Sequence, residues 1–348
     1  MRVRTELLWE VVEVVFELAL SLFLGFVVGV VVLQLLGVDP FEYFRILVLT
    51  GFSDIGDLLS KATPLIATGL AFALPALAGL FNIGGEGQLF IGALASLAVA
   101  YFSSNPLLAL IAGTAAGTGL GLIVGILRAY RDVNEVVSSI MLNWIVYYMT
   151  CFVLTVYLYN PIYPQNSVEV PPSARLAWIG SEEWSVPSCF IVAVLICIAM
   201  HLLLYRTPLG YTIRLVGYSI RSAKYVGIDH RKVWLYSMAL GGALAGLGGA
   251  LYVLGVVYYV DTSVHMLEGL GFTGIGVALI ARLQPLAIPI AAIFISGLMI
   301  GSSYVQVMGV PPELAQLVIG IIIVALSAPY AYRYLLSVIR TRTRLGKL

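Results

Sequence analysis

A short polar stretch between two apolar runs carries the residues best suited to contact a solute. Residues 82–88 read Asn-Ile-Gly-Gly-Glu-Gly-Gln, and Glu86 is the only acidic or basic side chain from Ala62 to Leu127. Glycine loosens a helix, and unwound backbone at membrane depth is tolerated only where protein or water satisfies it. An ionisable group at such a break is a candidate transport residue. The alternative is a solvated acid at a cytoplasmic turn, and the sequence leaves both interpretations open.

A second glycine-rich break lies nearer the C-terminus, in Leu270–Gly276. Paired interruptions in the two halves of a chain are typical of a transport site. Small residues also let helices approach closely, and tight packing is the favoured role for this second break. From the two breaks together we predict a translocation pathway with these candidate residues: Asn82, Gly84, Glu86, Gly87, Gln88, Gly271, Thr273 and Gly274.

Several kinds of chemistry lack their motifs in this sequence. There is no Gly-x-x-x-x-Gly-Lys-[Ser/Thr] phosphate loop, since the single Gly-Lys pair is at 346–347 near the chain end. No His-Glu-x-x-His or Gly-x-Ser-x-Gly motif occurs either. The three cysteines fall in or beside apolar segments without metal-ligand spacing, and the three histidines suggest no cluster. We therefore expect no enzyme activity, no metal and no bound cofactor, ATP included.

The composition is that of a membrane protein. Hydrophobic residues make up 60% of the 348 residues and charged residues only 11%, whereas a soluble domain has about 25% charged residues. The predicted fold class is an all-α polytopic membrane protein, with residues 1–348 as a single transmembrane domain in contact with membrane lipids. The net charge of +1 gives no reason to expect a nucleic-acid partner.

About ten transmembrane helices are predicted from the apolar segments. Residues 18–38 are uncharged and long enough to cross a bilayer, so we expect this segment to remain in the mature protein rather than to act as a cleaved signal. With a cytoplasmic N-terminus, most Lys and Arg fall inside, and both termini are cytoplasmic. The segment 268–281 is the least certain, because it is short enough to be a broken helix. The predicted spans are 18–38, 62–81, 86–103, 106–127, 136–159, 187–205, 235–258, 268–281, 285–304 and 313–332.

The hydrophilic loop 206–234 must then lie on the cytoplasmic side. It carries six of the 19 Lys and Arg of the chain. Within it we predict a short surface helix that Ser219 caps and that Gly227 ends, because Gly tolerates a positive φ. A short basic helix of this kind is a shape that a soluble partner could bind. The alternative is an ordinary cytoplasmic loop, since Lys and Arg gather on that side of any membrane protein.

Three motifs in this order resemble the permeases of ABC importers for branched-chain amino acids, ribose-type sugars and nucleosides. The first is Asn-x-Gly-x-x-Gly-Gln at 82–88, and the others are the loop residues 217–228 and the glycine-rich run Gly241–Gly249. The similarity extends from about Leu59 to Tyr330, and the sequence around 82–88 and 269–280 is most similar to simple-sugar and nucleoside permeases. The loop residues that carry the resemblance are Gly217, Ala223, Tyr225, Gly227 and Ile228.

This resemblance implies partners and a docking site. In such families the cytoplasmic loop is the coupling helix that docks on ABC ATPase subunits, which bind the ATP. A second permease subunit, different or identical, completes the pore, and an extracytoplasmic substrate-binding protein delivers the solute at the cell membrane. The residues implied in coupling are Ser219, Ile220, Arg221, Ser222, Ala223, Lys224, Tyr225, Val226, Gly227 and Ile228.

The resulting hypothesis is the permease subunit of an ATP-driven importer for nucleosides or simple sugars. Few charges occur in the spans, which favours a neutral, polar, ring-bearing solute. The preference for nucleosides over sugars comes from the resemblance alone. The rival hypothesis is an ion-coupled secondary transporter of a small polar solute, for which Glu86 is the candidate ion-binding residue. The long outer loop 160–187, rich in Pro and aromatic residues, either receives the binding protein or lies passively at the interface.

Overall fold

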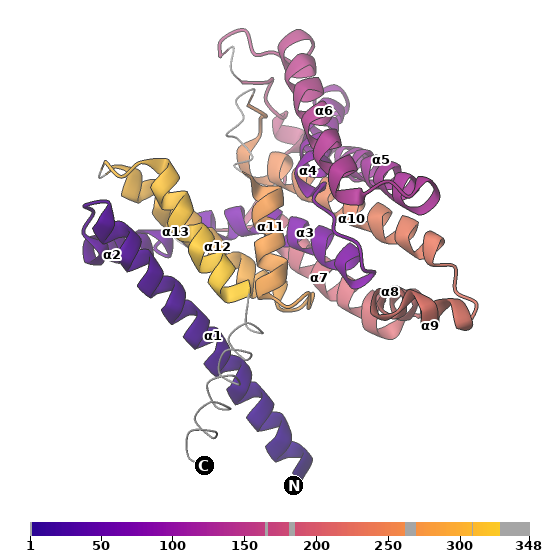
Figure 1. Ribbon diagram of the computed structural model, residues 1–348. Helices are drawn as coiled ribbons and strands as arrows, with labels where there is room; N and C mark the ends of the chain where they lie inside the picture. Colours follow the sequence, from indigo (N-terminus) through magenta and orange to yellow (C-terminus); the bar gives the residue numbers. More distant parts are fainter. Residues whose placement is uncertain (1, 164–165, 181–184, 262–268, 308, 328–348) are drawn as a thin grey trace, which may run out of the picture. The chain divides into compact units, whose positions relative to one another are not determined.

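The computed structural model describes residues 2–163, 166–180, 185–261, 269–307 and 309–327, with side chains from Ala19 onward (Figure 1). The described chain is mostly helical and forms two compact units. One unit combines Met1–Ser53 with Gly297–Leu348, and the other is Asp54–Ser296. All the candidate residues predicted from the sequence belong to the second unit.

The first unit is built on the long helix α1 (Arg2–Leu35). Gly25 of α1 faces α13 (Pro312–Ser327), where a Cβ on Gly25 would lie 3.1 Å from Cβ of Ala325. A short amphipathic helix, α2 (Pro40–Gly51), follows α1, and Asp39 caps it by accepting a hydrogen bond from the Phe41 N–H. Gly25 and Ala325 therefore let α1 and α13 approach closely.

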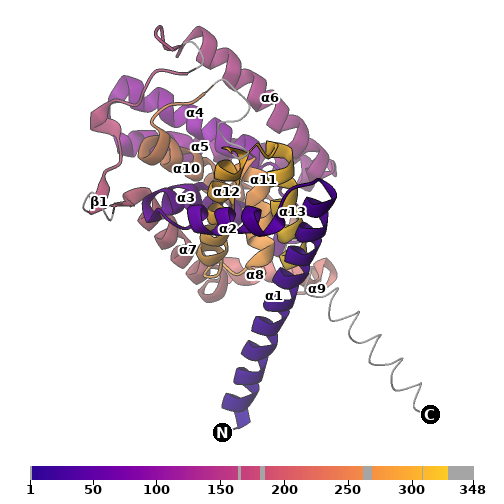
Figure 2. The same cartoon turned by 90° about the vertical axis from the view of Figure 1, so that its left-hand side faces the viewer.

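The second unit is centred on α10 (His230–Tyr252), which packs against α3 (Ile55–Leu77), α4 (Gly85–Ser103) and α5 (Pro106–Arg131) (Figure 2). The glycines of α10 explain this position. A Cβ on Gly242 would overlap the Gly117 carbonyl of α5, and one on Gly249 would overlap the Leu89 carbonyl of α4. Without side chains at these points, backbones approach closely, as is typical of membrane helices.

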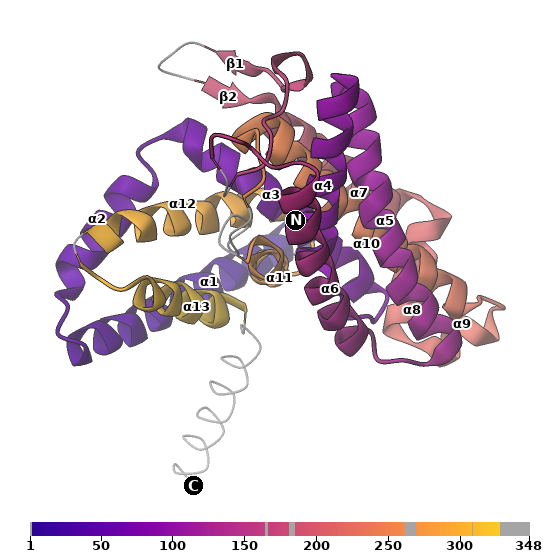
Figure 3. The same cartoon turned by 90° about the horizontal axis from the view of Figure 1, so that it is seen from above.

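Two further helices, α6 (Glu135–Val156) and α7 (Ser188–Arg206), are more exposed than α3 or α10. Helix α6 runs along α4 and α5, and Trp144 and Ile145 are exposed on its outer surface (Figure 1). Between α6 and α7 lie a single 3-10 turn, η1 (Pro172–Ala174), and a small antiparallel hairpin of β1 (Trp178–Gly180) and β2 (Ser185–Pro187) (Figure 3). Exposed apolar surface on α6 and α7 is what a helix in contact with lipid presents.

Seven of the described helices are long and apolar enough to cross a membrane. The chain is therefore a multi-pass membrane protein, but the predicted count of ten spans is not confirmed. The other three predicted spans correspond to shorter apolar stretches of described side chains, at 19–35 within the 34-residue α1, in α11 (Leu270–Ile280) and in α13. The seven candidate spans are α3, α4, α5, α6, α7, α10 with its extension to Val257, and α12 (Ile288–Val307).

Helix α11 is too short to span a bilayer by itself. Its 11 residues rise about 16 Å at 1.5 Å per residue, roughly half of a ~30 Å hydrocarbon core. Its start at Gly269, with φ 67°, borders residues 262–268, which lie outside the described part of the chain. The predicted span 268–281 is thus represented by a half-length helix among the described residues.

The loop that follows α6 is attached to the end of α10. Helix α10 continues into a π-helical turn, η2 (Val253–Val257), which ends at Tyr258 with φ 62°. The Val170 N–H donates to the Tyr258 carbonyl at 2.7 Å, and Trp178 Nε1 donates to the Gly255 carbonyl at 3.0 Å. These bonds satisfy backbone groups that a π-helical turn would otherwise leave unpaired. Trp178 therefore holds this turn in addition to being partly exposed.

Candidate functional site

The polar stretch predicted from the sequence forms a non-helical connection, residues 78–84, between α3 and α4. Helix α3 ends at Leu77, and Gly79 adopts φ 79°. The Leu80 N–H donates back to the Pro75 carbonyl at 3.0 Å and the Gly79 N–H to the Ala76 carbonyl at 3.0 Å. This closure by a glycine with positive φ ends a helix without unpaired carbonyls. The connection is therefore an ordered turn.

Two of the predicted pathway residues, Asn82 and Gln88, bond to each other in the interior. Each is 1% exposed. Asn82 Nδ2 donates to Gln88 Oε1 at 3.1 Å and to the Ala71 carbonyl at 3.0 Å. Asn82 Oδ1 accepts from Gln88 Nε2 at 3.3 Å and from the Gly84 N–H at 3.1 Å. In this conformation both amides therefore bond to the protein, and they fix the fold of the connection.

A residue that the sequence analysis missed, Asn143 of α6, completes the support of this connection. Its Oδ1 accepts from the Gly87 N–H at 3.0 Å, and its Nδ2 donates to the Ile83 carbonyl at 3.1 Å. A Cβ on Gly87 would lie 2.7 Å from Asn143 Oδ1, so the glycine is needed for the approach. The sequence feature that could have pointed to Asn143 is its position as the single amide residue in the otherwise apolar stretch 140–147.

Glu86 joins the first break to the second. Its Oε2 accepts a hydrogen bond from the Gly271 N–H at 2.6 Å, at the start of α11. A Cβ on Gly271 would overlap the Glu86 backbone, and one on Gly274 would overlap the Thr68 hydroxyl. A carboxylate beside the first N–H groups of a helix satisfies a free donor and interacts favourably with the helix dipole. Glu86 thus acts as a cap for a helix far away in the sequence.

The remaining contacts of α11 reinforce this junction. The Thr68 hydroxyl, buried in α3, lies 3.1 Å from the Leu270 carbonyl and 2.9 Å from the Pro64 carbonyl. Thr273, on the first turns of α11, is half-buried. The structure therefore brings Glu86, Gly271 and Gly274 together with Thr68, while it places Asn82 and Gln88 behind them as support.

The predicted coupling residues 219–228 lie in and beside α9 (Ile220–Tyr225), which follows α8 (Pro208–Tyr218). These two short helices contact α7 and α10 (Figures 1 and 3). Ser219 caps α9, since its Oγ accepts from the Ser222 N–H at 3.2 Å. Helix α9 ends at Tyr225, and Gly227 adopts φ 78° while the Ile228 N–H bonds to the Ala223 carbonyl. The helix is therefore capped at both ends.

Only one side of α9 contacts the protein. Ala223 is fully buried, whereas Tyr225 is 86% exposed and Val226 is 64% exposed. Arg221 and Lys224 are exposed, and no ion pair involves either of them among the described residues. An exposed Tyr and Val beside free cations form a surface suited to an amphipathic, acidic partner.

No group of His, Cys, Asp and Glu that could hold a metal ion occurs among the described residues. The three cysteines, Cys151, Cys189 and Cys197, are free thiols, and the last two are buried. Cys189 Sγ lies beside Gly255 of the π-helical turn, where it fills the space that a side chain would occupy. The described site is thus built from backbone, amide and hydroxyl groups together with the single carboxylate of Glu86.

The sequence of this chain matches a known protein family. The family described as branched-chain amino acid transport system / permease component matches residues 55–327. The chain is a member of this permease family. It is therefore a transport subunit, and the ATP hydrolysis that drives such systems takes place in a separate ATPase.

Three relatives of the permease are similar along most of their length. A guanosine ABC transporter permease of Bacillus subtilis is 31% identical, covering 93% of this chain and 96% of that protein. A nucleoside ABC transporter permease of Lactococcus lactis subsp. cremoris is 31% identical, covering 91% and 92%. A glucose ABC transporter permease of Haloferax volcanii is 32% identical, covering 88% and 85%. The resemblance inferred from the three motifs is thus confirmed.

Proposed function

We propose that this permease carries a neutral nucleoside into the cell as part of an ABC importer. The observation that carries the proposal is the similarity, over nine-tenths of the chain, to permeases named for guanosine and nucleosides. A permease named for glucose is equally similar. The shared property is a neutral, ring-bearing, polar solute, and nucleosides are chosen because two of the three relatives are named for them.

The polar groups of the second unit support a neutral solute. Glu86 is the one carboxylate from Ala62 to Leu127, and it accepts the Gly271 N–H. A carboxylate engaged in capping α11 is poorly placed to serve as a freely exchanging ion site. Transport of a charged solute or of a driving ion through low dielectric requires a countercharge. Neutral hydroxyl-bearing solutes need only hydroxyl, amide and backbone groups.

The translocation pathway is proposed to pass the junction of α4 and α11. There Glu86 is half-buried, Thr273 is half-buried and Phe272 is 49% exposed. Gly271 and Gly274 would line the same junction, and Asn82, Gly84, Gly87 and Gln88 would hold its wall in shape through the bonds described above. The short length of α11 supports this assignment, because interrupted helices border the solute in many transporters.

The coupling site is proposed to be α9 and its flanks, residues 219–228. An ABC ATPase would dock on the exposed face that Tyr225 and Val226 present, with Arg221 and Lys224 at its edge. The termini and this loop would be cytoplasmic. ATP would be bound by the ATPase subunits and no cofactor by this chain. A second permease subunit, different or identical, and an extracytoplasmic binding protein would complete the importer.

A competition assay tests the substrate. Cells that express the importer are given labelled guanosine, and unlabelled adenosine, ribose, glucose or a charged amino acid is added in excess. The proposal predicts block by adenosine and no block by ribose, glucose or the amino acid. Block by the sugars alone would replace nucleosides with sugars, and block by a charged amino acid alone would contradict a neutral solute.

A further inference from the structure

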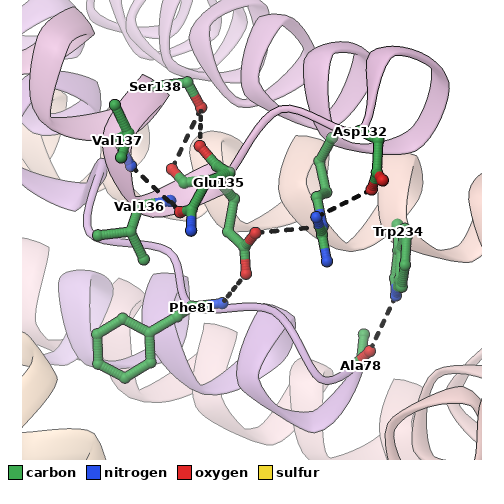
Figure 4. A network of polar contacts seen from close by, with 10 residues as sticks. Ala78, Phe81, Asp132, Glu135, Val136, Val137, Ser138 and Trp234 are labelled. Carbon is green, nitrogen blue, oxygen red and sulfur yellow. Dashed lines mark hydrogen bonds and ion pairs between the residues drawn. The ribbon is translucent and has the colours of Figure 1, made fainter.

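Several side chains link the polar connection between α3 and α4 to the neighbourhood of the proposed coupling site, residues 219–228, which is called the docking segment below. Glu135 Oε1 accepts the Phe81 N–H at 3.4 Å, and Glu135 Oε2 forms an ion pair with Arg128 Nε at 3.2 Å (Figure 4). The Arg128 guanidinium carbon lies 5.0 Å from the centroid of the Trp234 ring. Trp234 Nε1 then donates to the Ala78 carbonyl at 3.2 Å. These five residues form a continuous series of contacts that begins at Phe81 and returns to the same connection at Ala78. We call this set the Arg128 clamp.

The clamp is partly buried, so its charges interact more strongly than surface charges do. The Arg128 side chain is 27% exposed, and the Glu135 side chain is 13% exposed. Trp234 is 8% exposed. A second acid, Asp132, forms an ion pair with Arg128 Nη1 at 3.2 Å. The Asp132 side chain is 92% exposed, so this second pair lies on the solvent side of the guanidinium. Removing one partner of a buried pair is costly because it leaves the other charge without compensation.

Both ends of the clamp lie in the connection 78–84, and its middle reaches the start of α10, close to the docking segment. Trp234 lies in the second turn of α10, which begins at His230 directly after the predicted coupling residues. Ala78 and Phe81 belong to the connection 78–84, and Phe81 directly precedes Asn82. A displacement of the segment 219–228 would move the start of α10 and, through Trp234 and Arg128, the connection.

We propose that the Arg128 clamp positions the connection 78–84 in response to the docking segment, so that ATPase movement reaches the pathway wall. This inference rests on the proposed function. It assigns a positioning role to Arg128, Glu135 and Trp234, none of which belongs to the predicted coupling or pathway residues. Coupling between two sites needs such a continuous set of packed and bonded groups, or a shared two-state element.

The test compares assembled complexes of permease, ATPase and binding protein in lipid nanodiscs. Arg128→Gln and Glu135→Gln each remove the ion pair, and Glu135→Gln keeps an oxygen for the Phe81 N–H. We expect unchanged basal ATP hydrolysis, while stimulation by guanosine-loaded binding protein falls about tenfold, the factor that ~1.4 kcal/mol represents.

Arg131→Gln is the matched control. It removes the same charge from the last turn of the same helix, where Arg131 is exposed and makes no ion pair among the described residues. Stimulation should stay at the wild-type level. If Arg128→Gln lowers basal and stimulated hydrolysis in the same proportion, or leaves stimulation unchanged, Arg128 is merely structural and the proposal is wrong.

Two further measurements keep the outcome decisive. If Arg128→Gln does not assemble, Trp234→Phe is used, because it keeps the ring beneath Arg128 and loses only the bond to the Ala78 carbonyl. Wild-type stimulation in Trp234→Phe would overturn the clamp. A wild-type complex that fails to bind an ATPase would contradict the proposed function. Hydrogen exchange of amides 78–84 then decides the clamp separately, since these amides should exchange faster in Trp234→Phe and at the wild-type rate in Arg131→Gln.

Discussion

Replacing Asn82 alone with Ala should destabilise the permease more than replacing Asn82 with Ala and Gln88 with Met together. Asn82→Ala removes both bonds to the Gln88 amide and leaves that amide, 1% exposed, without its partner. It also removes a partner from the Ala71 carbonyl and from the Gly84 N–H. Each buried polar group left unpaired costs about 1–3 kcal/mol. With partial relaxation, we expect a loss of about 2–4 kcal/mol in the free energy of unfolding.

The double variant Asn82→Ala with Gln88→Met separates hydrogen bonding from loss of volume. Methionine approximates the length of glutamine without an amide, so no unpaired side-chain group remains at position 88. Replacing both partners of a buried hydrogen bond with apolar groups is far less costly than removing one. We expect the double variant to be about 1 kcal/mol more stable than Asn82→Ala alone, a non-additivity that a double-mutant cycle detects.

The assay is denaturant unfolding of the purified permease in detergent, followed by tryptophan fluorescence, for the wild type, both single variants and the double variant. Two-state transitions with equal slopes are required before the free energies are compared. Additive losses, with the double variant the least stable of the four, would refute the claim that the two amides are engaged with each other. Losses below 0.5 kcal/mol in Asn82→Ala would refute the same claim, because they are within the range of ordinary surface substitutions, about ±0.5 kcal/mol.

Two glycine substitutions test the packing and the docking segment. Gly246→Val should lower the unfolding temperature strongly, because its Cβ would lie 2.5 Å from the Gly113 carbonyl; Gly119→Val, with open space around its Cβ, should not, and equal shifts would contradict the close approach of α10 and α5. Gly227→Val should reduce co-purification with the ATPase, since a β-branched residue does not readily adopt φ 78°. Gly227→Asn should be tolerated, and normal binding by both would show that the turn after α9 is unimportant.

Much of the fold was predictable because apolar segments and turn residues are local signals. The short helix of the docking segment follows from Ser219 and Gly227, whose roles depend only on neighbouring backbone. The glycine run of α10 is visible in the sequence, and the structure shows that it packs against α4 and α5. The predicted count of ten spans is not confirmed, because hydropathy does not separate a half-length helix such as α11 from a complete one.

The site was less predictable because its key contacts join residues far apart in the sequence. Glu86 was an outstanding residue in the sequence, but its partner at Gly271 depends on how α11 packs. Asn82 and Gln88 were predicted as pathway residues, and their mutual bonds come from the turn geometry of the connection. Asn143 and Glu135 gave only weak signals, since a single polar residue on an apolar helix has many explanations.

Measuring which energy source drives uptake tests directly whether the chain belongs to an ATP-driven importer. The permease, its ATPase and its binding protein are reconstituted in proteoliposomes, and uptake of labelled guanosine is measured with either ATP or an imposed proton or sodium gradient. We predict uptake that requires ATP on the ATPase side and the binding protein on the opposite side, with no response to either gradient. Uptake that follows a gradient and ignores ATP would contradict this prediction and favour an ion-coupled transporter.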